Sequence, residues 1–127
     1  MSRRQLYEYA VIQVVPRVER GEFVNAGVIL FSKEAKYIGM RYEVNEEKIR
    51  ALDSAADINK ITNLLNTFEK ICYGMADSGP IGRLDAPERF RWLTAKRSTM
   101  IQTSEVHPGL CANPEKKLEQ LFRELVL

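Results

Sequence analysis

The chain has 127 residues, enough for one domain with a sizeable core, and its hydrophobic and charged fractions of 45% and 28% are ordinary for a globular protein. Its formal net charge is +2, from 19 basic and 17 acidic residues, which excludes a general electrostatic attraction to nucleic acid or anionic membranes. No apolar run approaches the roughly 20 residues that cross a bilayer, and the charged start is followed by no signal-type segment. We therefore expect a single cytoplasmic domain over residues 1–127 and no membrane contact.

Three strands are predicted in the first third of the chain. Residues Tyr7–Val15 are rich in aromatic and β-branched side chains and end at Pro16. Residues Phe23–Ser32 contain the run Val28–Phe31, which is apolar on both faces and indicates a central strand. Residues Tyr37–Tyr42 alternate in the manner of a third strand. Because the connections are short and polar, these strands predict an antiparallel meander.

The periodicity then becomes helical. Asn45 can cap a short helix, and Asp57 can cap a longer one. The longer helix carries apolar residues at three- and four-residue spacing, which is typical of a core-facing stripe. These residues are Ile58, Ile61, Leu64, Leu65, Phe68, Ile71, Cys72 and Met75. Residues 76–86 are predicted to form a long loop, and residues Pro87–Ala95 a third short helix.

The last third is predicted to contain one strand and one helix. Residues Thr99–Val106 alternate weakly as a fourth strand, and residues 107–109 read as a turn. Residues 113–115, Asn-Pro-Glu, are a typical helix start that leads into a Leu-rich final helix. The order of elements predicts an α+β domain, with an antiparallel sheet of about four strands and helices packed on one face.

The segment RVERGEFVNAGVILFS, residues 17–32, places polar groups and glycines where a buried strand begins. One hypothesis makes Glu22 and Asn25 a polar pair that binds a ligand or performs acid–base chemistry. The other makes the segment structural: Asn25 bonds backbone groups at a β-bulge, Glu22 pairs with a nearby arginine, and Gly27 permits close backbone approach after the break at Gly21. We favour the structural interpretation.

The same segment resembles the N-terminal signature of a bacterial family, domain of unknown function 3037. That signature is a Tyr-rich strand ending in proline, then Arg-Gly-Glu-Phe-Val-Asn-aliphatic-Gly-Val, which residues 20–28 match. The Pro-Glu start and Leu-rich final helix also resemble the family's C-terminal end. The resemblance extends over nearly the whole chain.

This resemblance implies a regulatory role and no particular chemistry. The family brings no established catalytic activity to carry over. Its members are often encoded beside kinases that resemble the toxin HipA of toxin–antitoxin systems, which implies that this chain is the small partner of such a kinase.

A basic and aromatic segment between residues 83 and 97 is the candidate binding site. Its residues are Arg83, Arg89, Arg91, Trp92 and Arg97. Arginine and tryptophan are the residue types that dominate protein interfaces. The same combination can hold phosphates and stack on bases, although the near-neutral net charge counts against nucleic acid.

No metal or cofactor site is expected. His107 is the sole histidine, and Cys72 and Cys111 lack metal-ligand spacing. We interpret both cysteines as reduced thiols. A Cys111–His107 nucleophile pair is conceivable from the four-residue spacing but shows no sign of activation. Residues 79–83, Gly-Pro-Ile-Gly-Arg, lack the full pattern of a phosphate loop.

The composition, the segment 83–97 and the family resemblance together predict a non-enzymatic interaction or regulatory module with a protein partner. A nucleic-acid-binding domain is the first alternative. A small enzyme that uses Glu22 and Asn25 is the second.

Overall fold

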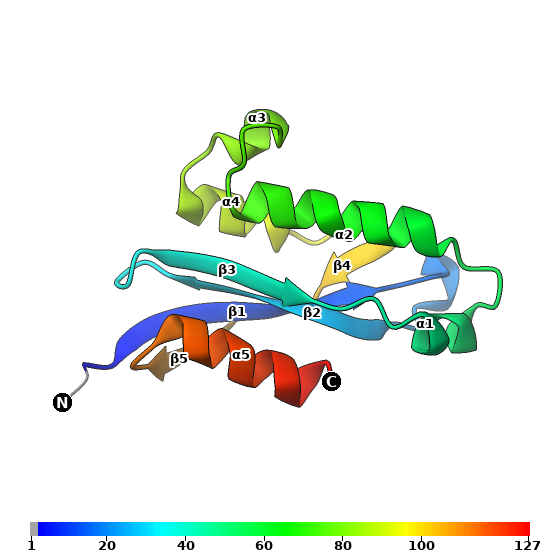
Figure 1. The fold of residues 1–127 in the computed structure, drawn as a ribbon, viewed down its shortest axis with the longest axis horizontal. Coiled ribbons are helices and arrows are strands. Elements are labelled where there is room, and N and C mark those ends of the chain that lie inside the picture. The colour runs from blue at the N-terminus through cyan, green and yellow to red at the C-terminus, as the bar shows by residue number, and fades with distance from the viewer. Residues whose placement is uncertain (1–2) are drawn as a thin grey trace.

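The computed structural model describes residues 3–127, which form an antiparallel sheet of five strands together with five α-helices (Figure 1). The predicted α+β class is confirmed. The strands are β1 (Gln5–Val14), β2 (Val24–Ser32), β3 (Tyr37–Tyr42), β4 (Ile101–Thr103) and β5 (His107–Cys111). The α-helices are α1 (Glu46–Leu52), α2 (Ile58–Cys72), α3 (Gly79–Gly82), α4 (Ala86–Leu93) and α5 (Pro114–Leu125).

The sheet is built around β1 and β2. Strands β3, β2 and β1 form the predicted meander, and the other edge of β1 is shared by two short strands. Strand β4 pairs with residues 12–14 of β1, and β5 pairs with residues 5–9. The segment 107–109, predicted as a turn, is therefore the first part of β5, and the predicted strand Thr99–Val106 is reduced to the three residues of β4. Backbone pairing with β1 determines both the short length of β4 and the strand conformation of residues 107–109. This pairing is not visible in the local sequence.

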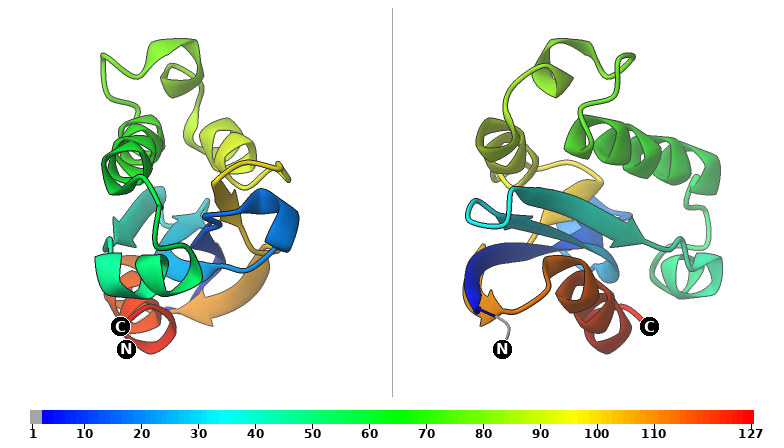
Figure 2. Two further views of the ribbon diagram at one scale, coloured as in Figure 1. Left: turned by 90° about the vertical axis from the view of Figure 1, so that its right-hand side faces the viewer. Right: turned by 60° about the vertical axis from the view of Figure 1, so that its left-hand side comes forward.

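Helices cover both faces of the sheet, which corrects the expectation of helices on one face. In Figure 2, α2 and α4 lie side by side on one face with α3 beyond them, and α5 lies on the other. The reason is β2, which buries Ile29 and Phe31 in the core under α2 and α4, and Val28 and Leu30 in a second core under α5. A strand that is apolar on both faces needs a helix on each side.

The predicted caps Asn45, Asp57 and Asn113 are present, and Asp85 is a fourth cap that was not predicted. The side chains of Asn45, Asp57, Asp85 and Asn113 each accept a hydrogen bond from a backbone N–H in the first turn of α1, α2, α4 and α5. The predicted loop 76–86 differs, because residues 79–82 form the short helix α3. Within residues 3–127, no helix has the length and apolar character needed to cross a bilayer.

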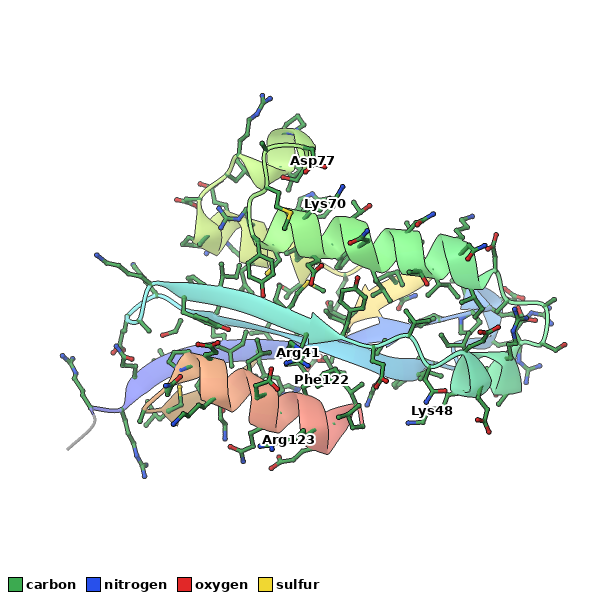
Figure 3. The ribbon with its side chains drawn as sticks, in the orientation of Figure 1. Arg41, Lys48, Lys70, Asp77, Phe122 and Arg123 are labelled. Carbon is green, nitrogen blue, oxygen red and sulfur yellow. The ribbon has the colours of Figure 1, made fainter. Side chains whose placement is uncertain are left out.

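Side-chain interactions connect neighbouring elements on both faces of the sheet. Arg41 of β3 lies over the ring of Phe122 on α5, with 5.0 Å from its guanidinium carbon to the ring centroid, and also pairs with Glu119 (Figure 3). On the opposite face, Lys70 near the end of α2 pairs with Asp77 at 2.8 Å, across the turn that leads to α3 (Figure 3).

Candidate functional site

Three side chains from α2, α4 and the segment after α4 form a partly exposed aromatic cluster. The rings of Phe68 and Trp92 lie 6.4 Å apart between centroids. The Arg97 guanidinium carbon lies 4.7 Å from the Trp92 centroid and 5.1 Å from the Phe68 centroid. We call Phe68, Trp92 and Arg97 the aromatic–arginine surface.

The aromatic–arginine surface presents one exposed ring and one oriented positive charge. Phe68 is buried, whereas Trp92 keeps 37% of its surface accessible. Burial lowers the pKa of Arg97 below its ordinary value, but a guanidinium stays protonated throughout the physiological range. Arg97 also donates a hydrogen bond to the Trp92 carbonyl, which orients the guanidinium over the rings. Cation–π contacts of this kind hold an arginine in place without pairing its charge.

A polar pocket of about 410 Å³ adjoins this surface, and Arg97 belongs to both. Its lining residues are Lys96, Arg97, Ser98, Gln102 and Thr103. Among residues 3–127, no carboxylate lies within ion-pair distance of Lys96 or Arg97. The Thr103 hydroxyl oxygen is buried and has no hydrogen-bond partner. The pocket therefore holds two positive charges, and the Thr103 hydroxyl is enclosed behind its wall.

The other arginines of the segment 83–97 do not join the cluster. Arg89 donates from Nε to the Cys72 carbonyl at 3.3 Å and from Nη1 to the Leu84 carbonyl at 2.6 Å, so its guanidinium fastens α4 to the end of α2. Arg83 and Arg91 are exposed, the first directly after α3 and the second in the last turn of α4. The structure thus brings together Trp92 and Arg97 among the five residues predicted from sequence.

The free edge of β3 is occupied by a side chain. The Tyr73 hydroxyl accepts a hydrogen bond from the Met40 N–H at 3.1 Å and donates one to the Met40 carbonyl at 3.3 Å. Both main-chain groups of Met40 on the edge are therefore already paired. An incoming strand would have to displace Tyr73 before it could pair there.

The Gly- and Asn-containing segment forms a β-bulge. In the pairing of β1 with β2, Ile12 lies opposite Gly27 and Gln13 opposite Asn25, so Ala26 is the extra residue. The bulge changes which face each side chain occupies, because two neighbouring residues then lie on one face. Asn25 consequently lies on the α5 side, where its Nδ2 donates to the Leu125 carbonyl at 3.1 Å, and its Oδ1 is buried without a partner.

The flanking residues of this segment have local contacts. Gly21 adopts a left-handed conformation with φ of 71°, and Glu22 pairs with Arg20 at 2.6 Å on the surface. The hydrogen bond from Arg20 lowers the pKa of the Glu22 carboxyl. A Cβ atom on Gly27 would lie 2.6 Å from the Arg41 carbonyl oxygen, so this position requires glycine for close packing of β2 and β3.

A second pocket, of about 420 Å³, lies beside Asn25 between α1 and the end of α5. Most of its lining is apolar and includes the half-exposed Phe23 and the exposed Leu127. Lys48, labelled in Figure 3, lies at its margin with Nζ 3.5 Å from the Val126 carbonyl.

The thiols and the histidine do not form a reactive group. Burial raises the pKa of Cys72 to about 12 and also raises that of Cys111. His107 and Cys111 are at opposite ends of β5, and His107 packs against Tyr9 with 5.4 Å between ring centroids. Within residues 3–127, no group of three or more His, Cys, Asp and Glu side chains is placed to hold a metal ion.

Comparison with known proteins assigns the chain to a family. The family model described as Protein of unknown function (DUF3037) matches residues 9–126. The chain therefore belongs to this family, as its sequence resemblance predicted. No curated protein and no solved structure shows significant similarity to it.

Several residues of these sites cannot be recognised from the local sequence. The helical spacing of Phe68 predicts a core position in α2, and Tyr73 carries no sequence signal because its role depends on the position of Met40, 33 residues away. The polar side chains Ser98, Gln102 and Thr103 follow Arg97 closely in the chain. Their density of hydroxyl and amide groups is the signal that could have indicated the pocket.

Proposed function

We propose that this chain is a non-enzymatic interaction module that binds a protein partner through the aromatic–arginine surface. The observation that carries the proposal is the exposed Trp92, which packs against the buried Phe68 and against the Arg97 guanidinium, a group that no carboxylate of residues 3–127 pairs with. Tryptophan and arginine are enriched among residues that dominate binding energy, and both are pre-organised here by packing. A partner that covers Trp92 gains apolar burial without first ordering a flexible side chain.

The sheet edges are weaker candidates for the same role. The Tyr73 hydroxyl occupies the middle of the β3 edge at Met40. On the other side, β4 has three residues and β5 contains Pro108, which has no N–H to offer an added strand. These features support a helix-face interface over strand addition.

A kinase resembling HipA and encoded nearby is the first partner to test. This choice rests on the family resemblance. Co-expression of the two proteins followed by size-exclusion chromatography should give one co-eluting complex at micromolar concentration. Separate elution would overturn the partner proposal. Co-elution that is retained by both Trp92→Ala and Arg97→Gln would overturn the proposed surface alone.

Nucleic acid remains the alternative ligand of the segment 83–97. Arg89 is engaged with two carbonyls, so Arg83, Arg91 and Arg97 are the arginines left for phosphate contacts. We expect at most weak binding to single- or double-stranded probes by fluorescence anisotropy at about 150 mM salt, where phosphate contacts are screened. Sub-micromolar binding that Arg91→Ala abolishes would favour this alternative.

The small-enzyme hypothesis has less support. Glu22 pairs with Arg20 on the surface, and the Asn25 amide donates to the end of α5. The groups that contact these two side chains offer no general base with a tuned pKa.

A further inference from the structure

We propose that the polar pocket formed by Lys96, Arg97, Ser98, Gln102 and Thr103 binds a phosphate monoester dianion carried on a side chain of the partner. The pocket has a volume of about 410 Å³, large enough for a phosphate group and the atoms that attach it. This inference rests on the proposed function only for the source of the phosphate. The pocket itself is independent of that proposal.

Charge balance points to a dianion. Lys96 and Arg97 bring two positive charges, and no carboxylate within residues 3–127 pairs with either. A phosphate monoester carries a charge close to −2 near neutral pH, which two cations match. A single carboxylate would leave one of them uncompensated.

The donor groups point to a phosphate in the same way. The ammonium group of Lys96, the guanidinium of Arg97 and the hydroxyl of Ser98 can all donate hydrogen bonds to the several acceptor oxygens of a phosphate. The Gln102 amide donates to the Thr99 carbonyl at 2.8 Å and keeps a second N–H.

Arg97 is held ready for this task. Its guanidinium carbon lies within 5.1 Å of the Phe68 and Trp92 centroids, and its hydrogen bond to the Trp92 carbonyl fixes one end of the planar group. Stacking of this kind leaves the edge of the guanidinium available for an oxyanion. A partner segment with a phosphorylated side chain next to an apolar residue could therefore occupy the pocket and cover Trp92 together.

The test is a titration of the isotope-labelled chain followed by amide chemical shifts in NMR spectra. The probes are N-acetyl-phosphoserine amide, N-acetyl-serine amide, inorganic phosphate and a single-stranded oligothymidylate. We expect the phosphorylated probe to shift the resonances of Ser98, Gln102 and Thr103, and the unphosphorylated one to leave them unchanged. Arg97→Gln should weaken phosphoserine binding about tenfold or more, since a charge-assisted hydrogen bond is lost.

The matched control is Arg91→Gln, which removes the same charge from an exposed arginine outside the pocket, and we expect it to change the affinity by less than about twofold. Equal weakening by both variants would overturn the pocket assignment. Shifts centred on Asn113 and Lys116, which line another basic pocket at the start of α5, would also overturn it. Tighter binding of the oligothymidylate than of phosphoserine would replace the proposal with nucleic-acid binding.

The source of the phosphate is tested with a phosphoserine peptide that carries a leucine next to the phosphoserine. Tighter binding of this peptide than of inorganic phosphate, lost in Trp92→Ala, would support a partner side chain. Equal affinity for the peptide and inorganic phosphate would overturn that source and leave a site for a free oxyanion. Because these probes contain no partner protein, failure of the kinase complex would not change the result.

Discussion

The Tyr73 hydroxyl binds both main-chain groups of Met40, at 3.1 Å from its nitrogen and 3.3 Å from its oxygen, and so occupies the middle of the free β3 edge with one side chain. We expect Tyr73→Phe to lower the free energy of unfolding by about 1–2 kcal/mol, because the Met40 N–H loses its partner. The variant should also self-associate more at high concentration, since the edge is open. Urea unfolding and light scattering measure the two effects.

The control for this prediction is Tyr42→Phe, because no hydrogen bond to the Tyr42 hydroxyl is present within residues 3–127. It should leave both the stability and the association state close to those of the parent. If Tyr73→Phe behaves like Tyr42→Phe, the Tyr73 hydroxyl does not protect the edge.

Alkaline pH should destabilise the fold through buried tyrosines. Burial raises the pKa of Tyr37 to about 12 and also raises the pKa of Tyr73 above its ordinary value of 10.0. Between about pH 10 and 12 the unfolded chain loses these protons while the folded chain keeps them, so the stability falls as the pH rises. Urea unfolding across this range should show a steeper decline for the parent than for Tyr37→Phe. Parallel declines would contradict the prediction.

The Asn25 amide is expected to stabilise the end of α5. Asn25→Ala removes the hydrogen bond to the Leu125 carbonyl and should cost about 1 kcal/mol. Asn25→Asp should cost more at neutral pH, because a buried carboxylate oxygen then faces the carbonyl. The folded state would raise the pKa of that carboxyl, so the Asp variant should regain stability as the pH falls toward its protonation. An Asp variant at least as stable as the Ala variant at neutral pH would refute this role.

Gly27→Ala should destabilise the chain by about 1–3 kcal/mol through overpacking between β2 and β3. The added Cβ would meet the Arg41 carbonyl oxygen at 2.6 Å and the Tyr42 Cβ at 2.9 Å. Gly21→Asn is the matched substitution, since Gly21 has open space around it and asparagine tolerates its positive φ. Thermal unfolding should separate the two variants clearly, and equal melting temperatures would contradict the packing argument.

Local signals were sufficient for most elements of the fold. The alternation in β3 and the caps at Asn45, Asp57 and Asn113 predicted those elements closely, because the residues that determine them are neighbours in the chain. Strand β5 was missed because His-Pro-Gly has the composition of a turn and becomes a strand only by pairing with residues 7–9 of β1.

In the candidate sites as well, some residues can be recognised from the local sequence and others only from contacts between distant parts of the chain. Residue type alone makes Trp92 and Arg97 candidates for an interface, since both types are frequent there. Arg89 could not be separated from them, because its engagement depends on carbonyls of Cys72 and Leu84 that only the packed helices bring near. Phe68 lies 24 residues before Trp92, and its contact with Trp92 comes from the packing of α2 against α4.

Binding of a partner over Trp92 is tested by the affinity of the proposed partner, a HipA-like kinase, for two variants of this chain that each lack one exposed aromatic side chain. Trp92 and Phe23 are both exposed aromatic side chains, with 37% and 50% of their surfaces accessible, on separate parts of the molecule. Calorimetric titration should show that Trp92→Ala raises the Kd about 30-fold or more, as expected for an interface anchor worth about 2 kcal/mol, and that Phe23→Ala leaves the Kd nearly unchanged. An unchanged Kd for Trp92→Ala together with a large loss of affinity for Phe23→Ala would contradict binding over Trp92 and place the interface at the pocket between α1 and α5.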